Sequence, residues 1–248
     1  MKILFLDIET APNIAHVWNV WQENIGINQM MDASYVLCWA ASWLGSDDIF
    51  FESIETQKSK TMLKKIHVLL DAADVVVHYN GSKFDIPTLN KEFLEYGFNP
   101  PAPYKQIDLL RTVRSQFRFP FNKLEYVAKA LDIGDKIKHG GHELWVRVMS
   151  GDSDAWMEMQ EYNVQDVRLL KGLYYKVLPW IKGHPNHGLF SNNTDIQCPQ
   201  CGSDKLQRRG TQHALSHSYQ RYQCTVCGSW CRSVLSEKEA PKLVVRTL

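Results

Sequence analysis

The nine-residue run KILFLDIET at Lys2–Thr10 constrains the fold more than any other segment of the chain. Its apolar residues, Ile3 to Leu6 and Ile8, leave no polar face, which is typical of a strand covered on both sides. A covered strand near the start of a chain of 248 residues predicts an α/β domain in which helices flank a sheet.

Asp7 and Glu9 lie at the end of this predicted strand. Residues two apart on a strand point to the same face, so the two carboxylates lie side by side. They repel each other unless a cation lies between them, and such oxygen ligands suit Mg²⁺ or Mn²⁺. The alternative is a strand end at which both groups are solvated.

A further acid, Asp85, follows the strand-like segment 74–80 and a turn at Gly81. The sequence Phe-Asp-Ile-Pro at 84–87 begins a predicted helix that ends near Gly97. Asp85 has two interpretations that do not exclude each other. It can cap the helix N-terminus, because Pro87 lies just inside the helix start, and it can face a metal ion.

The last acidic signal is Asp166, on a predicted helix at 155–178. One face of this helix carries Tyr162, Asp166, Leu169, Leu170, Leu173 and Val177. An ionised Asp in an apolar stripe is costly unless it is paired, protonated or bound to metal. A buried, hydrogen-bonded Asp is the alternative.

These motifs, LDIET around Asp7 and Glu9, HYNGxxFD ending at Asp85, and YxxxD from Tyr162 to Asp166, resemble the three exonuclease motifs of the DEDD superfamily. They occur in the same order, and the tyrosine is that of the DEDDy branch. Over roughly residues 1–182 the chain is similar to the proofreading domain of family B DNA polymerases and to its stand-alone ribonuclease-H-like relatives. The resemblance implies an RNase H-like mixed sheet flanked by helices and 3′→5′ hydrolysis of nucleic acid.

The resemblance also implies the site. Two Mg²⁺ or Mn²⁺ ions would be held by Asp7, Glu9, Asp85 and Asp166, with Asp7 as the bridging ligand. Tyr162 would orient the attacking water, because a phenol that titrates near pH ~10 is a poor base.

Three further residues match substrate-contacting positions in similar enzymes. Thr10 and Asn80 would lie beside the terminal nucleotide, and Phe84 would pack against a base. For Phe84 the alternative is a place in the hydrophobic core.

The rest of the first domain is predicted from its pattern. Strands are expected at 35–44, 49–54, 75–78 and 106–110, and helices at 60–70 and 124–131, in a mixed, largely parallel sheet. Residues 11–34 are too long for a structureless loop, so local structure or a lid is expected there. The basic segment 136–142 is expected to be a solvated loop.

Beyond residue 182 the character changes. Residues 183–195 are rich in turn formers and are predicted to be a linker. Cys198 and Cys201 are then matched by Cys224 and Cys227, with 22 residues between the pairs. Four thiolates suit one structural Zn²⁺, and the spacing resembles a zinc ribbon built on a long β-hairpin at 196–248. Two disulfides are the alternative.

Charge is unevenly distributed. Residues 1–186 carry 20 Lys and Arg against 23 Asp and Glu, whereas residues 187–248 carry 8 against 4. A small basic module rich in aromatic residues indicates nucleic-acid binding. Ribbons also bind proteins, so a replication or polymerase partner is a further expectation.

We therefore predict a metal-dependent 3′→5′ exonuclease with single-stranded DNA as the favoured substrate. Trimming of RNA 3′ ends and a non-catalytic adaptor role for the ribbon are the alternatives. No apolar run approaches the ~20 residues of a membrane span, and the chain begins directly with a strand, so we expect no membrane association and an intracellular, cytoplasmic location.

Overall fold

The computed structural model describes residues 1–21, 24–137, 140–192, 195–214 and 217–236. It divides into two compact units, one from Lys2 to Leu173 and one that comprises Met1 and the chain from Tyr174 onward. The boundary falls inside the longest helix, so the two units are described separately.

A five-stranded sheet forms the centre of the first unit, with strand order β5-β4-β1-β6-β7. The strands are β1 (Ile3–Thr10), β4 (Val36–Trp43), β5 (Phe50–Ser53), β6 (Val75–His78) and β7 (Lys105–Asp108). The β1–β6 and β6–β7 pairs are parallel, whereas β1–β4 and β4–β5 are antiparallel. The sheet is mixed as predicted, but it is not largely parallel, because β1, β4 and β5 follow one another without the crossover helix that parallel strands require.

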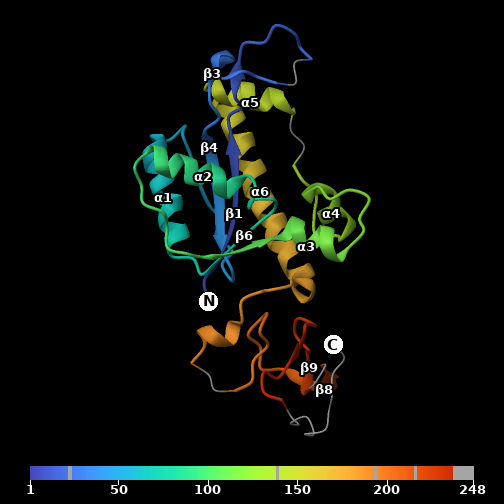
Figure 1. Cartoon of the computed structure of the whole chain (residues 1–248). Coiled ribbons are helices and arrows are strands. Elements are labelled where there is room, and N and C mark those ends of the chain that lie inside the picture. Colours follow the sequence, from blue (N-terminus) through green and yellow to red (C-terminus); the bar gives the residue numbers. More distant parts are fainter. Residues whose placement is uncertain (22–23, 138–139, 193–194, 215–216, 237–248) are drawn as a thin grey trace. The chain divides into compact units, whose positions relative to one another are not determined.

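Six helices accompany this sheet. They are α1 (Ser59–Asp71), α2 (Asp85–Glu95), α3 (Leu109–Gln116), α4 (Leu124–Ala130), α5 (His142–Met149) and α6 (Ser153–Val177). Helices α1 and α2 lie on one face of the sheet and α6 lies on the other (Figure 1). In the described part of the chain, no helix has both the length and the apolar character of a membrane span.

The alternation of β1 decides what faces α6. Leu4, Leu6 and Ile8 join the core formed with α1 and α2. The intervening residues Asp7 and Glu9 therefore point to the opposite face, where α5 and α6 pack against β4. The two carboxylates thus enter the layer between sheet and α6.

An arm follows β1 where local structure was expected. It contains β2 (Ile14–Ala15), the 3₁₀ turn η1 (Ile27–Gln29) and β3 (Met30–Asp32), and β2 pairs antiparallel with β3. Trp18 and Trp21 on this arm are 92% and 90% exposed. The arm therefore contributes little to the core of the unit.

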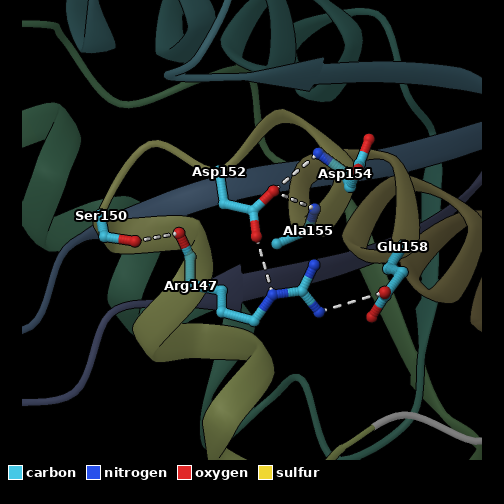
Figure 2. Close-up of polar contacts among 6 residues, drawn as sticks. All are labelled: Arg147, Ser150, Asp152, Asp154, Ala155 and Glu158. Carbon is cyan, nitrogen blue, oxygen red and sulfur yellow. Dashed lines mark hydrogen bonds and ion pairs between the residues drawn. The ribbon is translucent and has the colours of Figure 1, made fainter.

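The start of α6 is fixed by Asp152, as Figure 2 shows. Its Oδ1 accepts hydrogen bonds from the backbone N–H groups of Asp154 (2.9 Å) and Ala155 (3.2 Å), which caps the helix. Its Oδ2 accepts from Arg147 Nε at 2.8 Å, and Arg147 Nη1 also donates to Glu158 Oε1 at 3.1 Å. Asp152 thus joins the end of α5 to the start of the helix that carries Tyr162 and Asp166.

Replacing Asp152 tests this junction. We expect Asp152→Ala to lower the thermal unfolding midpoint, because it removes the cap and the partner of Arg147 together. Asp152→Asn keeps an oxygen acceptor for the helix N–H groups and should lower the midpoint less. Asp154→Ala, two residues further along the chain, is the matched control. An Asp152→Ala protein that unfolds at the wild-type temperature would contradict the assignment.

In the second unit the chain leaves α6 through η2 (Leu178–Trp180) and η3 (His187–Phe190). A three-stranded sheet follows, ordered β10-β9-β8, from β8 (Leu206–His213), β9 (Ser218–Cys224) and β10 (Trp230–Arg232). The pairing of β8 with β9 is the predicted hairpin. Residues 183–195, predicted as a linker, include η3, and His187 N donates to Pro199 O at 2.8 Å.

Candidate active site and zinc site

Three of the four predicted acidic ligands come together. One carboxylate oxygen each from Asp7, Glu9 and Asp166 lie within 4.8 Å of one another. Asp7 and Glu9 reach this point from the end of β1 and are half-buried, and Asp166 reaches it from α6 and is buried. Residues 159 positions apart in the chain thus form one oxygen-lined cluster between the sheet and α6.

Asp85, the fourth predicted ligand, lies beside this group. It is the first residue of α2 and is buried, and its Oδ1 accepts a hydrogen bond from Ile8 N at 3.1 Å. The N-cap residue of α2 is Phe84, so the interpretation of Asp85 as the helix cap is wrong. The bond to Ile8 places its charge next to the two acids that flank Ile8 in β1.

Burial and mutual repulsion raise the pKa of each β1 acid. For Asp7 burial is the main cause, followed by the charges of Asp85, Glu9 and Asp166. For Glu9, burial and then the Asp166 carboxylate raise the pKa to about 8. Burial raises the pKa of Asp85 to about 7. Without a cation, the cluster therefore resists full ionisation near neutral pH.

Lys136 is a site residue that the sequence reasoning missed. Its Nζ lies 2.7 Å from Asp166 Oδ2 and 4.4 Å from the centroid of the Tyr162 ring. Burial lowers the pKa of this ammonium, but the Asp166 carboxylate outweighs burial and the net pKa lies above its usual range. The expectation of a solvated loop at 136–142 is wrong at this position, and His139 lies outside the described residues.

Tyr162 lies one helical turn before Asp166 and is buried against Trp145, whose ring is 6.0 Å away between centroids. Burial, and then the charges of Glu9 and Asp166, raise the pKa of its phenol above the usual value. The hydroxyl therefore stays protonated at neutral pH.

Asn163, also missed from the sequence, orients Asp7. It is fully buried on α6, and its Nδ2 donates to Asp7 Oδ2 at 2.7 Å. Its Oδ1 lies 4.0 Å from the thiol sulfur of Cys38, the residue opposite Glu9 on β4. The segment YNVQD indicates a polar side chain at Asn163 next to Tyr162. No rule of sequence spacing predicts which residues the Asn163 amide contacts.

The three predicted substrate contacts occupy distinct surroundings. Thr10 is half-buried at the end of β1, where the register with β4 shifts. Asn80 is exposed and has a positive φ of 69°, and its N donates to Asp108 Oδ1 at 2.9 Å. Phe84 is 45% exposed, so its alternative placement in the core is wrong.

The donor set fits hard divalent cations. Carboxylate oxygens are the ligands that Mg²⁺ and Mn²⁺ prefer, and three of them lie within 4.8 Å of one another. Cations there would offset the repulsion that raises the pKa values of Asp7 and Glu9. The geometry therefore supports a divalent-cation site at the cluster.

Removing one charge from the cluster should stabilise the metal-free protein. In the folded state the pKa of Glu9 is about 8, against about 4.5 for an exposed Glu, so stability is lost as pH rises through this window. At about pH 5 we expect Glu9→Gln to unfold at the same temperature as the wild type. At about pH 8.5 we expect the variant to unfold at a higher temperature than the wild type. Buffers stripped of Mg²⁺ on a resin leave bound zinc in place for this measurement.

The same pair of proteins has an internal control. Saturating Mg²⁺ should raise the unfolding temperature of the wild type more than that of Glu9→Gln, because the variant offers one ligand fewer. A variant that is less stable than the wild type near about pH 8.5 without Mg²⁺ would refute the repulsion argument.

A second cluster lies in the ribbon. The thiol sulfurs of Cys198, Cys201, Cys224 and Cys227 all lie within 4.8 Å of one another. The Cys198–Cys227 and Cys201–Cys224 sulfur pairs are 3.6 Å apart. A disulfide would bring the sulfurs to about 2.05 Å, whereas tetrahedral zinc with bonds of about 2.3 Å separates them by about 3.8 Å. The arrangement fits zinc, and the disulfide alternative is wrong.

Each half of the zinc site is a tight turn whose backbone N–H groups point at a sulfur. Burial raises the pKa of Cys198, and the N–H groups of Gln200 and Cys201 oppose it. Burial acts in the same direction on Cys224, but here the N–H groups of Cys227 and Val226, together with the thiols of Cys201 and Cys227, outweigh it and lower the pKa to about 7. The two turns therefore hold the four sulfurs close enough together to bind one ion.

Elemental analysis should find one zinc per chain. Cys201→Ser should lose this zinc and unfold the ribbon, because metal binding and folding of such modules are coupled. Cys231→Ser is the matched control, since Cys231 is a free cysteine on β10 outside the cluster. Zinc retained by Cys201→Ser, or lost equally by Cys231→Ser, would contradict the assignment.

Comparisons with known proteins agree with this fold. The model of the RNase H superfamily matches residues 4–178, so the chain belongs to this superfamily. No curated protein matches the sequence. The structure is similar to that of the family B DNA polymerase from the hyperthermophilic archaeon Pyrobaculum calidifontis, with a TM-score of 0.58 and 18% sequence identity.

That match covers 72% of this chain but 24% of the polymerase, so the chain spans about a quarter of its length. At this identity the likeness shows the fold alone. RNase H-like nucleases use divalent cations, and family membership together with the acidic cluster supports nuclease activity on a nucleic acid.

Proposed function

We propose that the protein is a 3′→5′ exonuclease of the DEDDy type that hydrolyses single-stranded DNA with two divalent cations. The observation that carries this proposal is the convergence of Asp7, Glu9 and Asp166 in an RNase H fold, with Tyr162 one turn before Asp166. An inert adaptor would have no need to bury mutually repelling carboxylates at the end of its central strand.

The four acids would hold the cations, with Asp7 shared between them. Bound there, divalent cations would lower the pKa of an attacking water and neutralise charge on the leaving oxygen. Asn163 keeps Asp7 in place through its 2.7 Å bond, and Ile8 N does the same for Asp85 at 3.1 Å. Such partners fix the direction of the ligand oxygens.

Tyr162 would position the water. Because burial keeps its phenol protonated, it donates a hydrogen bond rather than removing a proton. Lys136 would balance the charge of Asp166, since its ammonium lies 2.7 Å from Oδ2. It also supplies a positive charge beside the position that a scissile phosphate would occupy.

Substrate contacts would come from Thr10, Asn80 and Phe84. Two features support this role: Phe84 is 45% exposed at the start of α2, and Asn80 is exposed at the turn before it. Exposed aromatic side chains stack on bases of single strands. DNA is favoured over RNA because of the resemblance to proofreading domains.

We further propose an intracellular, cytoplasmic enzyme whose ribbon contacts nucleic acid. A replication or polymerase partner at the ribbon is the second candidate. Its basis is the fold shared with a family B polymerase, of which this chain spans about a quarter.

Digestion of matched DNA and RNA oligonucleotides tests the proposal. A 5′-labelled strand should yield a ladder of shortening products with Mg²⁺, and a 3′-labelled strand should release label as mononucleotide at once. We expect DNA to be degraded faster than RNA. Faster degradation of RNA would favour the exoribonuclease alternative, and no degradation of either would refute the proposal.

Two variants assign the roles. Asp166→Asn should lower the Mg²⁺-dependent rate by about 10³-fold or more, because it removes a ligand charge. Tyr162→Phe should lower it by about 10²-fold with unchanged Mg²⁺ requirement, because it removes positioning alone. Tyr104→Phe, a partly buried tyrosine on the opposite core, is the control. Unchanged turnover in Tyr162→Phe would make the phenol purely structural.

A further inference from the structure

The second unit contains a cavity of about 580 Å³, within the about 300–1,000 Å³ range of ligand pockets. Its lining includes Tyr175 at the end of α6, Trp180 of η2 and Trp230 of β10. These rings are 54%, 49% and 53% exposed. Each of these three aromatic side chains at the cavity is thus about half exposed.

The walls of this cavity are held in place by the ribbon. Gln200 Nε2 donates to Ile181 O at 2.9 Å, which ties the first cysteine turn to the segment after η2. At Gly228, in the second cysteine turn, an added Cβ would lie 3.9 Å from Pro179. Trp230 lies opposite Gln223 in the β9–β10 pair. The first cysteine turn thus contacts the segment that follows Trp180, and Trp230 lies on a strand of the sheet rather than on a loose loop.

Cations accompany the aromatic rings. Lys176 lines the cavity, and the guanidinium of Arg221 lies 4.9 Å from the centroid of the Trp230 ring. Residues 196–236 carry five Lys and Arg against one acid, Asp204. Even after the charge of about −2 on a zinc bound by four thiolates, this part of the chain remains positive.

A comparison of the exposed tryptophans in the two units narrows the class of ligand. The arm at 14–32 exposes Trp18 and Trp21 more fully, but no Lys or Arg occurs between Lys2 and Lys58. Of these two sets of exposed tryptophans, the one in the second unit has cations beside its rings. Stacking surfaces beside positive charge are what single-stranded nucleic acids require.

We propose that this cavity is a base-stacking site for single-stranded nucleic acid, separate in sequence from the acidic cluster. A base would stack on Trp230 or Trp180, and Lys176 and Arg221 would contact the adjoining phosphates. The inference rests on the proposed function for its choice of ligand. It assigns to the ribbon unit the task of holding the strand, whereas the acids perform the hydrolysis.

Binding to an abasic strand isolates the stacking contribution. The full-length Asp166→Asn protein would be titrated with a fluorescein-labelled oligothymidylate of about 12 nucleotides and with an abasic strand of equal phosphate number. Trp230→Ala and Trp180→Ala should each weaken oligothymidylate binding by roughly 5- to 150-fold and leave abasic-strand binding unchanged. Trp230→Phe should retain most of the affinity. Zinc content verifies that each variant is folded.

Trp21→Ala, which removes an exposed tryptophan from the arm, is the matched control and should bind as the parent does. Equal affinity of the parent and both cavity variants for oligothymidylate would overturn the proposal. Equal losses on the abasic strand, or a larger loss in Trp21→Ala, would do so too. The same tryptophan variants are also made in the enzyme that retains Asp166, and their hydrolysis of the strand is measured separately. Failure of the cavity site and failure of the nuclease proposal are therefore distinguishable.

Discussion

Repulsion among carboxylates buried between β1 and α6 is the constraint on which the rest of the first unit depends. Asp7 and Glu9 must share a face because they alternate with Ile8, and that face is covered by the helix that carries Asp166. Ionising these groups in a buried layer costs free energy unless cations are present. Lys136 supplies one positive charge at 2.7 Å from Asp166. The negative charge that Lys136 does not compensate makes the cluster a strong candidate for binding divalent cations.

The corner between β6 and α2 shows how the fold serves this cluster. Asn80 has a positive φ, and a Cβ added at Gly81 would lie 2.5 Å from the His78 ring. Asp108 stabilises the corner by accepting from Asn80 N and from Ser82 Oγ at 2.6 Å. Part of the HYNG motif is therefore explained by the turn itself. The same turn places Asp85 where its carboxylate accepts a hydrogen bond from the backbone of β1.

Much of this site was predictable from local pattern, and the rest was not, for physical reasons. The period of two placed Asp7 with Glu9, and the helical period placed Tyr162 with Asp166. Lys136 and Asn163 were missed because their partners are distant in sequence, and only the tertiary fold decides whether a polar side chain meets a buried acid.

The sheet shows the same limit. Alternating strands and helices predicted largely parallel pairing, yet β1, β4 and β5 are antiparallel. The sequence predicted local structure between β1 and β4 without indicating its form. This arm folds as a hairpin rather than as a crossover helix. Length alone does not explain which short helices were predicted, since α4, of seven residues, was predicted and α3 and α5, of eight residues each, were not.

The two candidate metal sites of the chain differ in donor chemistry, and this difference sorts the ions. Thiolates bind zinc far better than Mg²⁺, whereas carboxylates in a half-buried cluster suit Mg²⁺ or Mn²⁺. In the ribbon, backbone N–H groups help to form the thiolate of Cys224 before any ion binds, because they hold its pKa at about 7. In the acidic cluster, burial and then the Asp166 carboxylate raise the pKa of Glu9 to about 8, and the opposing charge of Lys136 does not offset them. The ribbon therefore offers zinc a thiol that ionises readily, whereas the acidic cluster needs cations to ionise fully near neutral pH.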